Sequence, residues 1–379
     1  MATQKKPRLY ALTTTAVFLA LLFFLAIVNM AAPDRDFSEN ENRYLRQFPD
    51  FSWRALAEGS FTRDFEGYII DQFVGRDAWI GVKIAAEAAL QKDSSNGVYF
   101  TKNNGLIEMF DTMDRARFEK NLGFVQSFAQ AVEERFGIAV QTMLVPTSSL
   151  IYREALPTYA PEIDQQALLA EAAAALPGLV DVSEALLAHR DEDIYFATDH
   201  HWTSLGAFYA ANRYLAQVGL PERQPAEFAI EALSEQFYGT TWSKASLPGQ
   251  QPDVLTAWRD TAVVQVDYGP DKPVADSLYE RSFLSQKDKY SVFLGGNQPV
   301  TRIVTGADNG KKLLLIKDSY ANCFAQFLLR DYEEVILVDP RYYQQSYTDF
   351  IAENGVTDVL ILYYLKGFSG DTNVFYLDK

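Results

Sequence analysis

The feature that most constrains this 379-residue chain is an uncharged, apolar run from Leu9 to Ala32. At about 1.5 Å per residue, a helix of this length spans ~36 Å, which exceeds the roughly 30 Å hydrocarbon core of a bilayer. Lys5, Lys6 and Arg8 precede the run, and basic residues on a short flank favour the cytoplasmic side. We therefore expect a cytoplasmic tail at 1–8, a single-pass transmembrane anchor at 9–32 and an extracytoplasmic remainder.

A cleaved signal peptide is the main alternative for this run. The apolar region of a signal peptide covers about 7–15 residues and ends in small residues, as Ala31 and Ala32 are here. The run at 9–32 is longer, which favours an uncleaved anchor. The sequence alone leaves cleavage open.

Composition narrows the class of protein. A hydrophobic content of 48% with 22% charged residues excludes wholesale disorder. Lys and Arg total 34 against 50 Asp and Glu, and the net charge of −16 has the wrong sign for a protein that neutralises nucleic-acid phosphates. One Cys and three His leave no disulfide framework and no Cys-based zinc site. We expect a folded protein that binds no nucleic acid.

The pattern of apolar residues divides the rest of the chain into two parts. Residues 33–95 form a polar and aromatic stretch followed by apolar positions at helical spacing, which predicts a membrane-proximal helical connector. Residues 96–379 contain short apolar strands separated by helical stretches, with a polar, aromatic and Gly-rich insertion at 218–300. The expected strands are 137–146, 179–182, 311–318, 333–339 and 357–364. This alternation predicts an α/β domain whose parallel sheet has helices on both faces.

The first motif with chemical potential is Thr198-Asp199-His200-His201-Trp202-Thr203. In an extended segment, Asp199 and His201 point to one face and His200 to the other. Asp199 can then accept a hydrogen bond from one imidazole nitrogen and leave the other nitrogen available. Thr203 can cap the helix expected at 204–217 and so fix the backbone just after His201.

The second motif lies where the apolar strand at 311–318 turns sharply into a helix and Ser319 occupies the turn. A hydroxyl group at the carboxyl end of a strand lies where open α/β sheets bind their ligands. Backbone N–H groups at the start of the helix point towards a developing oxyanion. Lys317 and Asp318 are expected as a solvated flank.

Together the two motifs predict a nucleophile, Ser319, a general base, His201, and an orienting carboxylate, Asp199. Serine needs a base because its hydroxyl is inert at neutral pH, and the base needs a third group to fix its tautomer. Unrelated folds assemble such triads in different chain orders.

Each motif also has a simpler interpretation. Asp199, His200 and His201 resemble part of a metal site, but without further Cys or His ligands the site would need distant carboxylates, so we expect no metal. Ser319 alone fits the N-cap of a helix. The combination of both motifs favours the catalytic interpretation.

Four further residues are candidates for binding the oxyanion or the substrate. The amide of Asn297 and the backbone N–H of Gly296 are the donor types of an oxyanion hole, although a plain turn fits equally well. Tyr320 is expected to wall the pocket or to pack in the core. Arg341 follows the strand at 333–339 and is expected to contact a sugar or to cover the core.

Several motifs resemble those of the bacterial DHHW-motif proteins. They are TDHHWT at 198–203, FLGGN at 293–297, IKDSYAN at 316–322, DPRYY at 339–343, and the membrane-proximal FSENENRYL at 37–45 and DQFVGRDAWI at 71–80. That family is similar in turn to the SGNH-like O-acetyltransferases of alginate and related exopolysaccharides. In those enzymes an Asp-x-His-Trp motif and a later Asp-Ser-aromatic motif supply the triad.

The resemblance implies a permuted SGNH-hydrolase-like fold, with Asp199, His201 and Ser319 in the triad and no inherited role for His200. It also implies a polysaccharide acceptor, a membrane-bound O-acyltransferase as donor partner, and no cofactor. We expect a membrane-anchored, extracytoplasmic O-acetyltransferase. Two alternatives stay open: an acetylesterase with the same triad, and a non-catalytic protein of cell-surface assembly.

Overall fold

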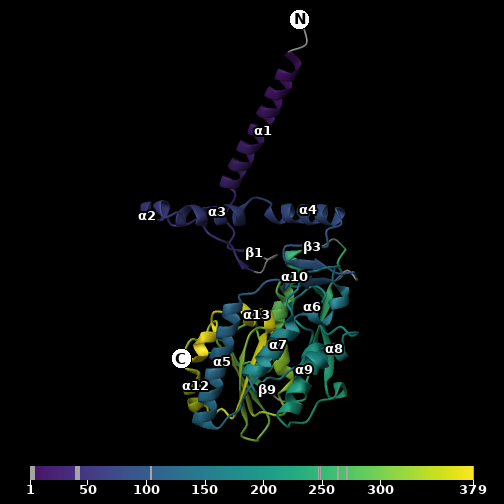
Figure 1. The fold of residues 1–379 in the computed structure, drawn as a ribbon, viewed down its shortest axis with the longest axis vertical. Coiled ribbons are helices and arrows are strands. Elements are labelled where there is room, and N and C mark those ends of the chain that lie inside the picture. Colours follow the sequence, from purple (N-terminus) through teal and green to yellow (C-terminus); the bar gives the residue numbers. More distant parts are fainter. Residues whose placement is uncertain are drawn as a thin grey trace. The chain divides into compact units, whose positions relative to one another are not determined.

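The computed structural model describes residues 5–38, 43–102, 105–245, 247, 249–262, 264–269 and 272–378. The chain forms two compact units, Met1–Leu90 and Gln91–Lys379 (Figure 1). The boundary between these units lies close to the expected end of the connector at residue 95.

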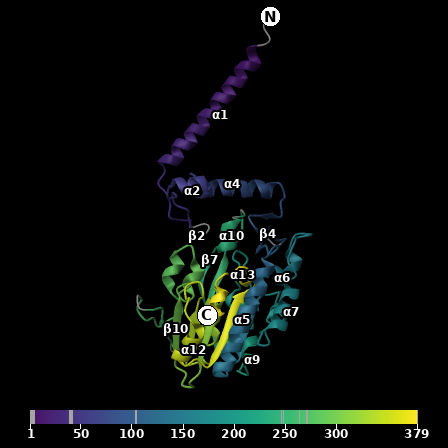
Figure 2. The ribbon, with the colours of Figure 1, turned by 60° about the vertical axis from the view of Figure 1, so that its left-hand side comes forward.

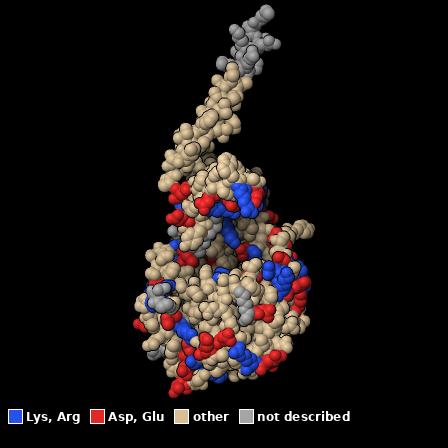
Figure 3. Space-filling view, turned by 90° about the vertical axis from the view of Figure 1, so that its left-hand side faces the viewer, with Lys and Arg blue, Asp and Glu red and all other residues tan. Residues whose placement is uncertain are grey.

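The first unit is mainly helical. Its helix α1 (Lys5–Ala31) contains a span, Tyr10–Ala31, that is long and apolar enough to cross a membrane and is not buried by the rest of the protein. The described part of α1 shows neither acidic nor basic side chains on the face seen in Figure 3. The remaining elements of the unit are β1 (Phe37–Ser38), β2 (Arg43–Tyr44), α2 (Trp53–Ala57), α3 (Ser60–Gln72) and α4 (Arg76–Ala89).

The second unit is built on a mixed sheet with the strand order β6-β13-β11-β12-β10-β9. Its strands are β6 (Val140–Val145), β13 (Asp358–Tyr364), β11 (Lys312–Lys317), β12 (Glu334–Val338), β10 (Val300–Thr305) and β9 (Val264–Asp267). The first four are mutually parallel, as expected, whereas β10 and β9 run antiparallel to their neighbours. An entirely parallel sheet was therefore a wrong expectation. The link from β10 to β11 is too short for the crossover that parallel strands need.

Helices cover both faces of the sheet. Successive residues of β11 alternate between two buried clusters: Leu313 and Leu315 pack on one face, and Leu314 and Ile316 on the other. The first face is covered by α8 (Ser183–Ala188), α9 (Ser204–Gln217) and α11 (Ala321–Phe324). The second is covered by α5 (Arg115–Phe136), α7 (Gln165–Ala175), α12 (Tyr347–Asn354) and α13 (Leu365–Gly370) (Figure 2). Because helices bury both faces of the sheet, the central strands are apolar throughout.

Two expected elements differ from the structure. The expected strand at 179–182 makes only one bridge, Leu179 to Thr142, because α8 begins directly after it. The expected insertion at 218–300 contributes β9 to the central sheet and so forms part of the fold. It also holds β7 (Ala229–Phe237), α10 (Thr240–Lys244) and β8 (Asp253–Arg259).

The remaining elements lie around this core. They are β3 (Ser94–Ser95), β4 (Val98–Phe100), β5 (Leu106–Glu108), α6 (Ser148–Ile151), η1 (Arg153–Ala155), η2 (Pro225–Glu227), η3 (Arg281–Ser285), η4 (Lys289–Val292), η5 (Ala325–Phe327) and η6 (Val374–Asp378). Strands β4 and β5 form the hairpin to which Glu108 belongs.

Candidate active site

The two sequence motifs meet at the carboxyl edge of the parallel strands. Ser319 follows β11 directly, in the turn before α11. His201 lies in a loop whose ends are held together by a bridge between Tyr195 and Trp202. Directly after this loop, the Thr203 hydroxyl caps α9 by accepting a hydrogen bond from the N–H of Gly206 at 3.3 Å. Both side chains therefore project from backbone that is fixed by secondary structure.

Asp199, His201 and Ser319 form one continuous chain of hydrogen bonds. His201 Nδ1 lies 2.5 Å from Asp199 Oδ1, and His201 Nε2 lies 2.7 Å from Ser319 Oγ. Asp199 and His201 are only 2% and 5% exposed, whereas Ser319 is half-buried. The hydroxyl is thus the part of this chain that a ligand can reach.

Thr240 holds the second carboxylate oxygen of Asp199. Its N–H and its hydroxyl donate to Asp199 Oδ2 at 2.6 and 2.9 Å. Burial alone would raise the pKa of Asp199, but His201, His200 and these hydrogen bonds favour the carboxylate more, so this pKa lies far below its ordinary value. Thr240 was missed in the sequence because nothing near it marks a site; it lies in the expected insertion.

Aromatic side chains fix the plane of the His201 ring. Tyr290 stacks on this ring with centroids 3.9 Å apart and an angle of 11° between the planes. The Tyr290 hydroxyl donates to the carbonyl of Ser319 at 3.3 Å, and Trp202 Nε1 donates to the carbonyl of Tyr320 at 3.0 Å. These contacts connect the histidine loop to the serine turn on the backbone side.

Tyr320 does not wall a pocket. Its side chain is fully buried, stacks on Tyr364 at 4.7 Å, and donates its hydroxyl to the carbonyl of His200. Its backbone N–H donates to Asp318 Oδ1 at 2.9 Å and so cannot serve an oxyanion as well. Tyr320 therefore packs in the core, and the expectation that it walls the substrate pocket was wrong.

Gly296 is not an oxyanion donor in this structure. Its N–H donates to the carbonyl of Phe293 at 3.2 Å. Leu294, Gly295 and Gly296 have φ angles of 58°, 65° and 82°, three successive residues in the left-handed region. A leucine in this region stores strain of about 1–3 kcal/mol. The turn gives Asn297 its position.

The amide of Asn297 is oriented by its neighbours. Its Oδ1 accepts hydrogen bonds from Lys317 Nζ at 2.9 Å and from Asn322 Nδ2 at 3.2 Å. Because that oxygen is occupied, the Nδ2 donor end must point away from Lys317. Among the described residues, neither Asn297 Nδ2 nor the N–H of Ser319 has a hydrogen-bond partner. These two groups are the donors that remain available.

Lys317 is buried, which corrects its expected place in a solvated flank. It is 2% exposed, and its ammonium group donates to Asn322 Oδ1 at 2.7 Å as well as to Asn297. Asp339 Oδ2 lies 3.8 Å from it. Burial lowers the pKa of Lys317 to about 8, against the opposing effect of Asp339.

Arg341 lies on the same sheet edge but is committed to an ion pair. Its Nε and Nη2 donate to the two carboxylate oxygens of Asp339 at 2.9 and 2.5 Å. Its side chain keeps 36% of its surface exposed, which leaves one flank for a ligand. The expected contact of Arg341 with a sugar stays a prediction.

The Asp199-His200-His201 cluster fits a metal poorly. The potential ligand atoms lie within 4.8 Å of one another. However, both ring nitrogens of His201 already contact protein groups, and His200 Nδ1 lies 2.7 Å from Thr240 Oγ1. A metal ion would have to break this network, so the donor set suits proton transfer better.

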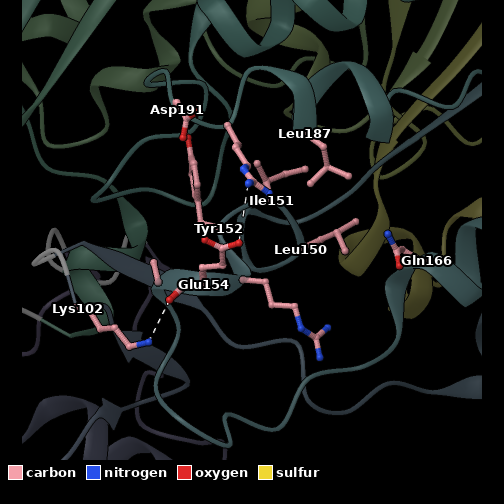
Figure 4. Close-up of a pocket in the computed structure, with 11 residues that line it drawn as sticks. Lys102, Leu150, Ile151, Tyr152, Glu154, Gln166, Leu187 and Asp191 are labelled. Atoms are coloured by element: carbon pink, nitrogen blue, oxygen red, sulfur yellow. Dashed lines mark hydrogen bonds and ion pairs between the residues drawn. The ribbon is translucent and has the colours of Figure 1, made fainter.

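A cavity of about 830 Å³ lies elsewhere in the second unit, beside α6 and η1. In Figure 4, Lys102 and Glu154 face each other, and Lys102 Nζ donates to the Glu154 carbonyl at 3.1 Å. None of Asp199, His201 and Ser319 lines this cavity. It therefore does not belong to the candidate site.

Comparisons with known proteins show what the chain as a whole is similar to. The model of the family described as "DHHW protein" matches residues 123–338. The chain is 26% identical over 211 residues to the probable alginate O-acetylase AlgJ of Pseudomonas syringae pv. tomato. The match covers 51% of this chain and 53% of that protein, so the chain spans about half the length of its curated relative.

Solved structures share the fold of about three quarters of the chain. A DHHW family protein from Eubacterium siraeum is 27% identical and has a TM-score of 0.65, over 75% of this chain and 96% of that one. Bacillus cereus PatB1, in a structure with a sulfonyl adduct, is 20% identical and has a TM-score of 0.62, over 74% of this chain and 98% of that one.

Proposed function

Because the chain belongs to the DHHW protein family, we propose that it is a membrane-anchored O-acetyltransferase with an SGNH-like catalytic domain. The observation that carries the proposal is the 2.7 Å contact between His201 Nε2 and Ser319 Oγ, with Asp199 behind the ring. The ionised Asp199 accepts the Nδ1–H of His201. The lone pair on Nε2 then faces the serine hydroxyl and can take its proton.

The proposed reaction has two halves. Ser319 Oγ attacks the carbonyl carbon of an acetyl ester, its proton passes to His201 Nε2, and the alcohol of the donor leaves with that proton. A sugar hydroxyl then gives its proton to His201 Nε2, and its oxygen attacks the acetyl-serine carbon. The bond between the acetyl carbon and Ser319 Oγ breaks, Ser319 Oγ takes the proton from His201 Nε2, and the sugar ester is released.

The negative carbonyl oxygen formed in each half needs hydrogen-bond donors. Asn297 Nδ2 and the backbone N–H of Ser319 are proposed for this role, because both are available and Lys317 fixes the orientation of the amide. Such donors act in a site from which water is partly excluded, where one of them contributes about 3–4 kcal/mol of transition-state stabilisation.

The acceptor and the donor partner are proposed from the relatives. The name of AlgJ, an alginate O-acetylase, supports a polysaccharide acceptor. Acetyl-CoA does not occur outside the cytoplasm, so a membrane-bound O-acyltransferase is proposed to deliver the acetyl group. The anchor α1 would keep the two proteins in one membrane, with the catalytic unit on the extracytoplasmic side.

Exposed apolar side chains in the first unit support a position at the membrane surface. They are Phe48, Phe51, Trp53, Ile70, Trp79 and Val82. Trp and Tyr are enriched at the interface between a bilayer and water, and helices that lie in this interface place Trp, Phe and Leu against the lipid. The connector is therefore proposed to lie against the lipid next to the anchor.

The test uses the full-length protein in detergent, with p-nitrophenyl acetate as donor and a mannuronate hexasaccharide as acceptor. We expect an acetyl or fluorophosphonate adduct on Ser319 by mass spectrometry. Acetylated sugar should form with the unchanged protein and not with Ser319→Ala. Acetate release without acetylated sugar would favour the esterase. The absence of any adduct on Ser319 would favour the non-catalytic alternative and overturn the proposal.

A further inference from the structure

Asp199 orients two imidazole rings, of which only His201 faces Ser319. Its Oδ1 contacts His201 Nδ1 at 2.5 Å, and its Oδ2 accepts the hydroxyl of Thr240 at 2.9 Å. The same Thr240 Oγ1 lies 2.7 Å from His200 Nδ1. One carboxylate therefore reaches the first ring directly and the second through a hydroxyl group.

This arrangement fixes the tautomer of His200. A threonine hydroxyl carries one proton, and that proton is donated to the carboxylate of Asp199. Thr240 Oγ1 must therefore accept the hydrogen bond from His200, which requires a proton on His200 Nδ1. Burial, together with the nearby His201, lowers the pKa of His200 to about 4, so the ring is neutral near pH 7. Its Nε2 atom then carries a lone pair and no proton.

The bare nitrogen is accessible. The His200 side chain is 23% exposed. Among the described residues, His200 Nε2 has no hydrogen-bond partner. It is also absent from the set of buried polar atoms without a partner, so the atom is not buried. A neutral imidazole nitrogen in this state accepts a hydrogen bond and donates none.

The two rings lie side by side, contrary to the expectation that they point to opposite faces. Their centroids are 3.9 Å apart and their planes differ by 38°. The reason is that residues 197–201 bend instead of extending, since the Tyr195 to Trp202 bridge closes the loop. Two acceptor nitrogens are thus presented together, one at the nucleophile and one beside it.

Polar groups lie near His200. Glu108 from β5 has its pKa lowered to about 2: burial alone would raise it, but His200 and Lys244 outweigh that effect. Lys244 Nζ lies 2.5 Å from Glu108 Oε1, and the Tyr364 hydroxyl donates to Glu108 Oε2 at 3.1 Å. Such charges and hydroxyl groups nearby suit a ligand with several hydroxyls better than an apolar one.

We propose that His200 Nε2 accepts a hydrogen bond from a second hydroxyl group of the acyl acceptor, on the carbon next to the one that is acetylated. The ligand class is a sugar ring with vicinal hydroxyls: one hydroxyl meets His201 and reacts, and its neighbour meets His200 and selects the acceptor. The inference rests on the proposed function and adds the basis of its acceptor specificity.

The test compares acceptors that differ by one hydroxyl group. Full-length protein in detergent transfers acetyl from p-nitrophenyl acetate to methyl α-mannopyranoside and to its four monodeoxy analogues. We expect one deoxy analogue, lacking the hydroxyl beside the acetylated position, to lose about tenfold in kcat/KM, as for one hydrogen bond. In His200→Phe, which keeps a ring against His201, this discrimination should disappear.

A second measurement reads the tautomer directly in the unchanged protein. Nitrogen-15 spectra of labelled histidine should show a protonated Nδ1 and a bare Nε2 for His200. Thr240→Ser keeps the hydroxyl and should keep both the tautomer and the discrimination. Thr240→Val removes the hydroxyl, so His200 should move its proton to Nε2 and lose the discrimination.

The outcomes separate the two proposals. No Ser319 adduct and no transfer by the unchanged protein would overturn the proposed function and this inference with it. Normal transfer with equal discrimination in His200→Phe and unchanged protein would overturn the inference alone. A proton on His200 Nε2 in the unchanged protein would do the same, even if His200→Phe failed to fold.

Discussion

His201 Nε2 lies 2.7 Å from Ser319 Oγ, although 118 positions of the chain separate the two residues. The hydroxyl comes from the end of β11 and the imidazole from the loop before α9, and of the two neighbouring imidazoles only that of His201 contacts Ser319. The two residues should therefore act as one unit in the proposed reaction.

The first prediction follows from that unit. Ser319→Ala and His201→Ala should each lower kcat for acetyl transfer by on the order of 10⁶-fold, and the double variant should be no worse than either. The measurement is the rate of p-nitrophenol release together with the adduct on Ser319. If the loss of kcat in the double variant equalled the product of the two single losses, the two side chains would act separately.

The second prediction concerns Gly239, whose lack of a side chain leaves room for Asp199. A Cβ atom at this position would lie 2.2 Å from both Cβ and Oδ2 of Asp199, while the φ of −87° suits any residue. Gly239→Ala should therefore displace the carboxylate and lower kcat/KM by about 10²-fold or more. The control is Gly123→Ala in α5, whose Cβ would meet nothing within 4 Å and which should keep full activity. Equal activity of both variants would contradict the prediction.

The sequence predicted the four parallel strands in the middle of the sheet and the three residues that meet in space, but it missed β9 and β10 and placed a strand at 179–182 that makes only one bridge. Apolar runs such as 311–318 and 357–364 are local signals, and a serine in a turn after a strand is local as well. The convergence of Ser319 with His201 was predicted from chemistry, because a serine nucleophile needs a histidine base beside it.

Other features depend on contacts that no local pattern encodes. Thr240 belongs to a polar segment without periodicity, and its role appears only when α10 packs against Asp199. A lysine is almost never fully buried, and the burial of Lys317 depends on acceptors that its own stretch of sequence does not reveal. The bend that puts His200 beside His201 likewise depends on a bridge across the loop.

The third prediction tests the connector against the lipid surface. Trp53 and Trp79 are 78% and 58% exposed, whereas Trp202 and Trp258 are buried in the second unit. In proteoliposomes, brominated lipids should quench part of the tryptophan fluorescence of the full-length protein. The double variant Trp53→Phe, Trp79→Phe should lose most of this quenching, and Trp258→Phe should retain it. Unchanged quenching in the double variant would place the connector away from the bilayer.

The fourth prediction concerns the oxyanion donor. Asn297→Ala should lower kcat by about 10²–10³-fold with little change in KM, because its Nδ2 is proposed to contact the carbonyl oxygen only as negative charge develops. The readout is the rate of Ser319 acetylation under saturating p-nitrophenyl acetate. A variant that raises KM and leaves kcat intact would assign Asn297 to ground-state binding instead.

The last prediction uses the buried ammonium of Lys317. As an ammonium it donates hydrogen bonds to Asn297 and Asn322 and forms an ion pair with Asp339 at 3.8 Å. Its pKa is about 8, so as the pH rises through 8 the group loses its charge, the ion pair with Asp339 is lost, and the charge-assisted hydrogen bond to Asn297 weakens. The amide of Asn297 is then less firmly oriented, and kcat for Ser319 acetylation should fall between pH 7 and 9. Lys317→Met should be slower at pH 7 and should lack this fall, because its side chain does not titrate. The same fall in both proteins would assign the titration to another group.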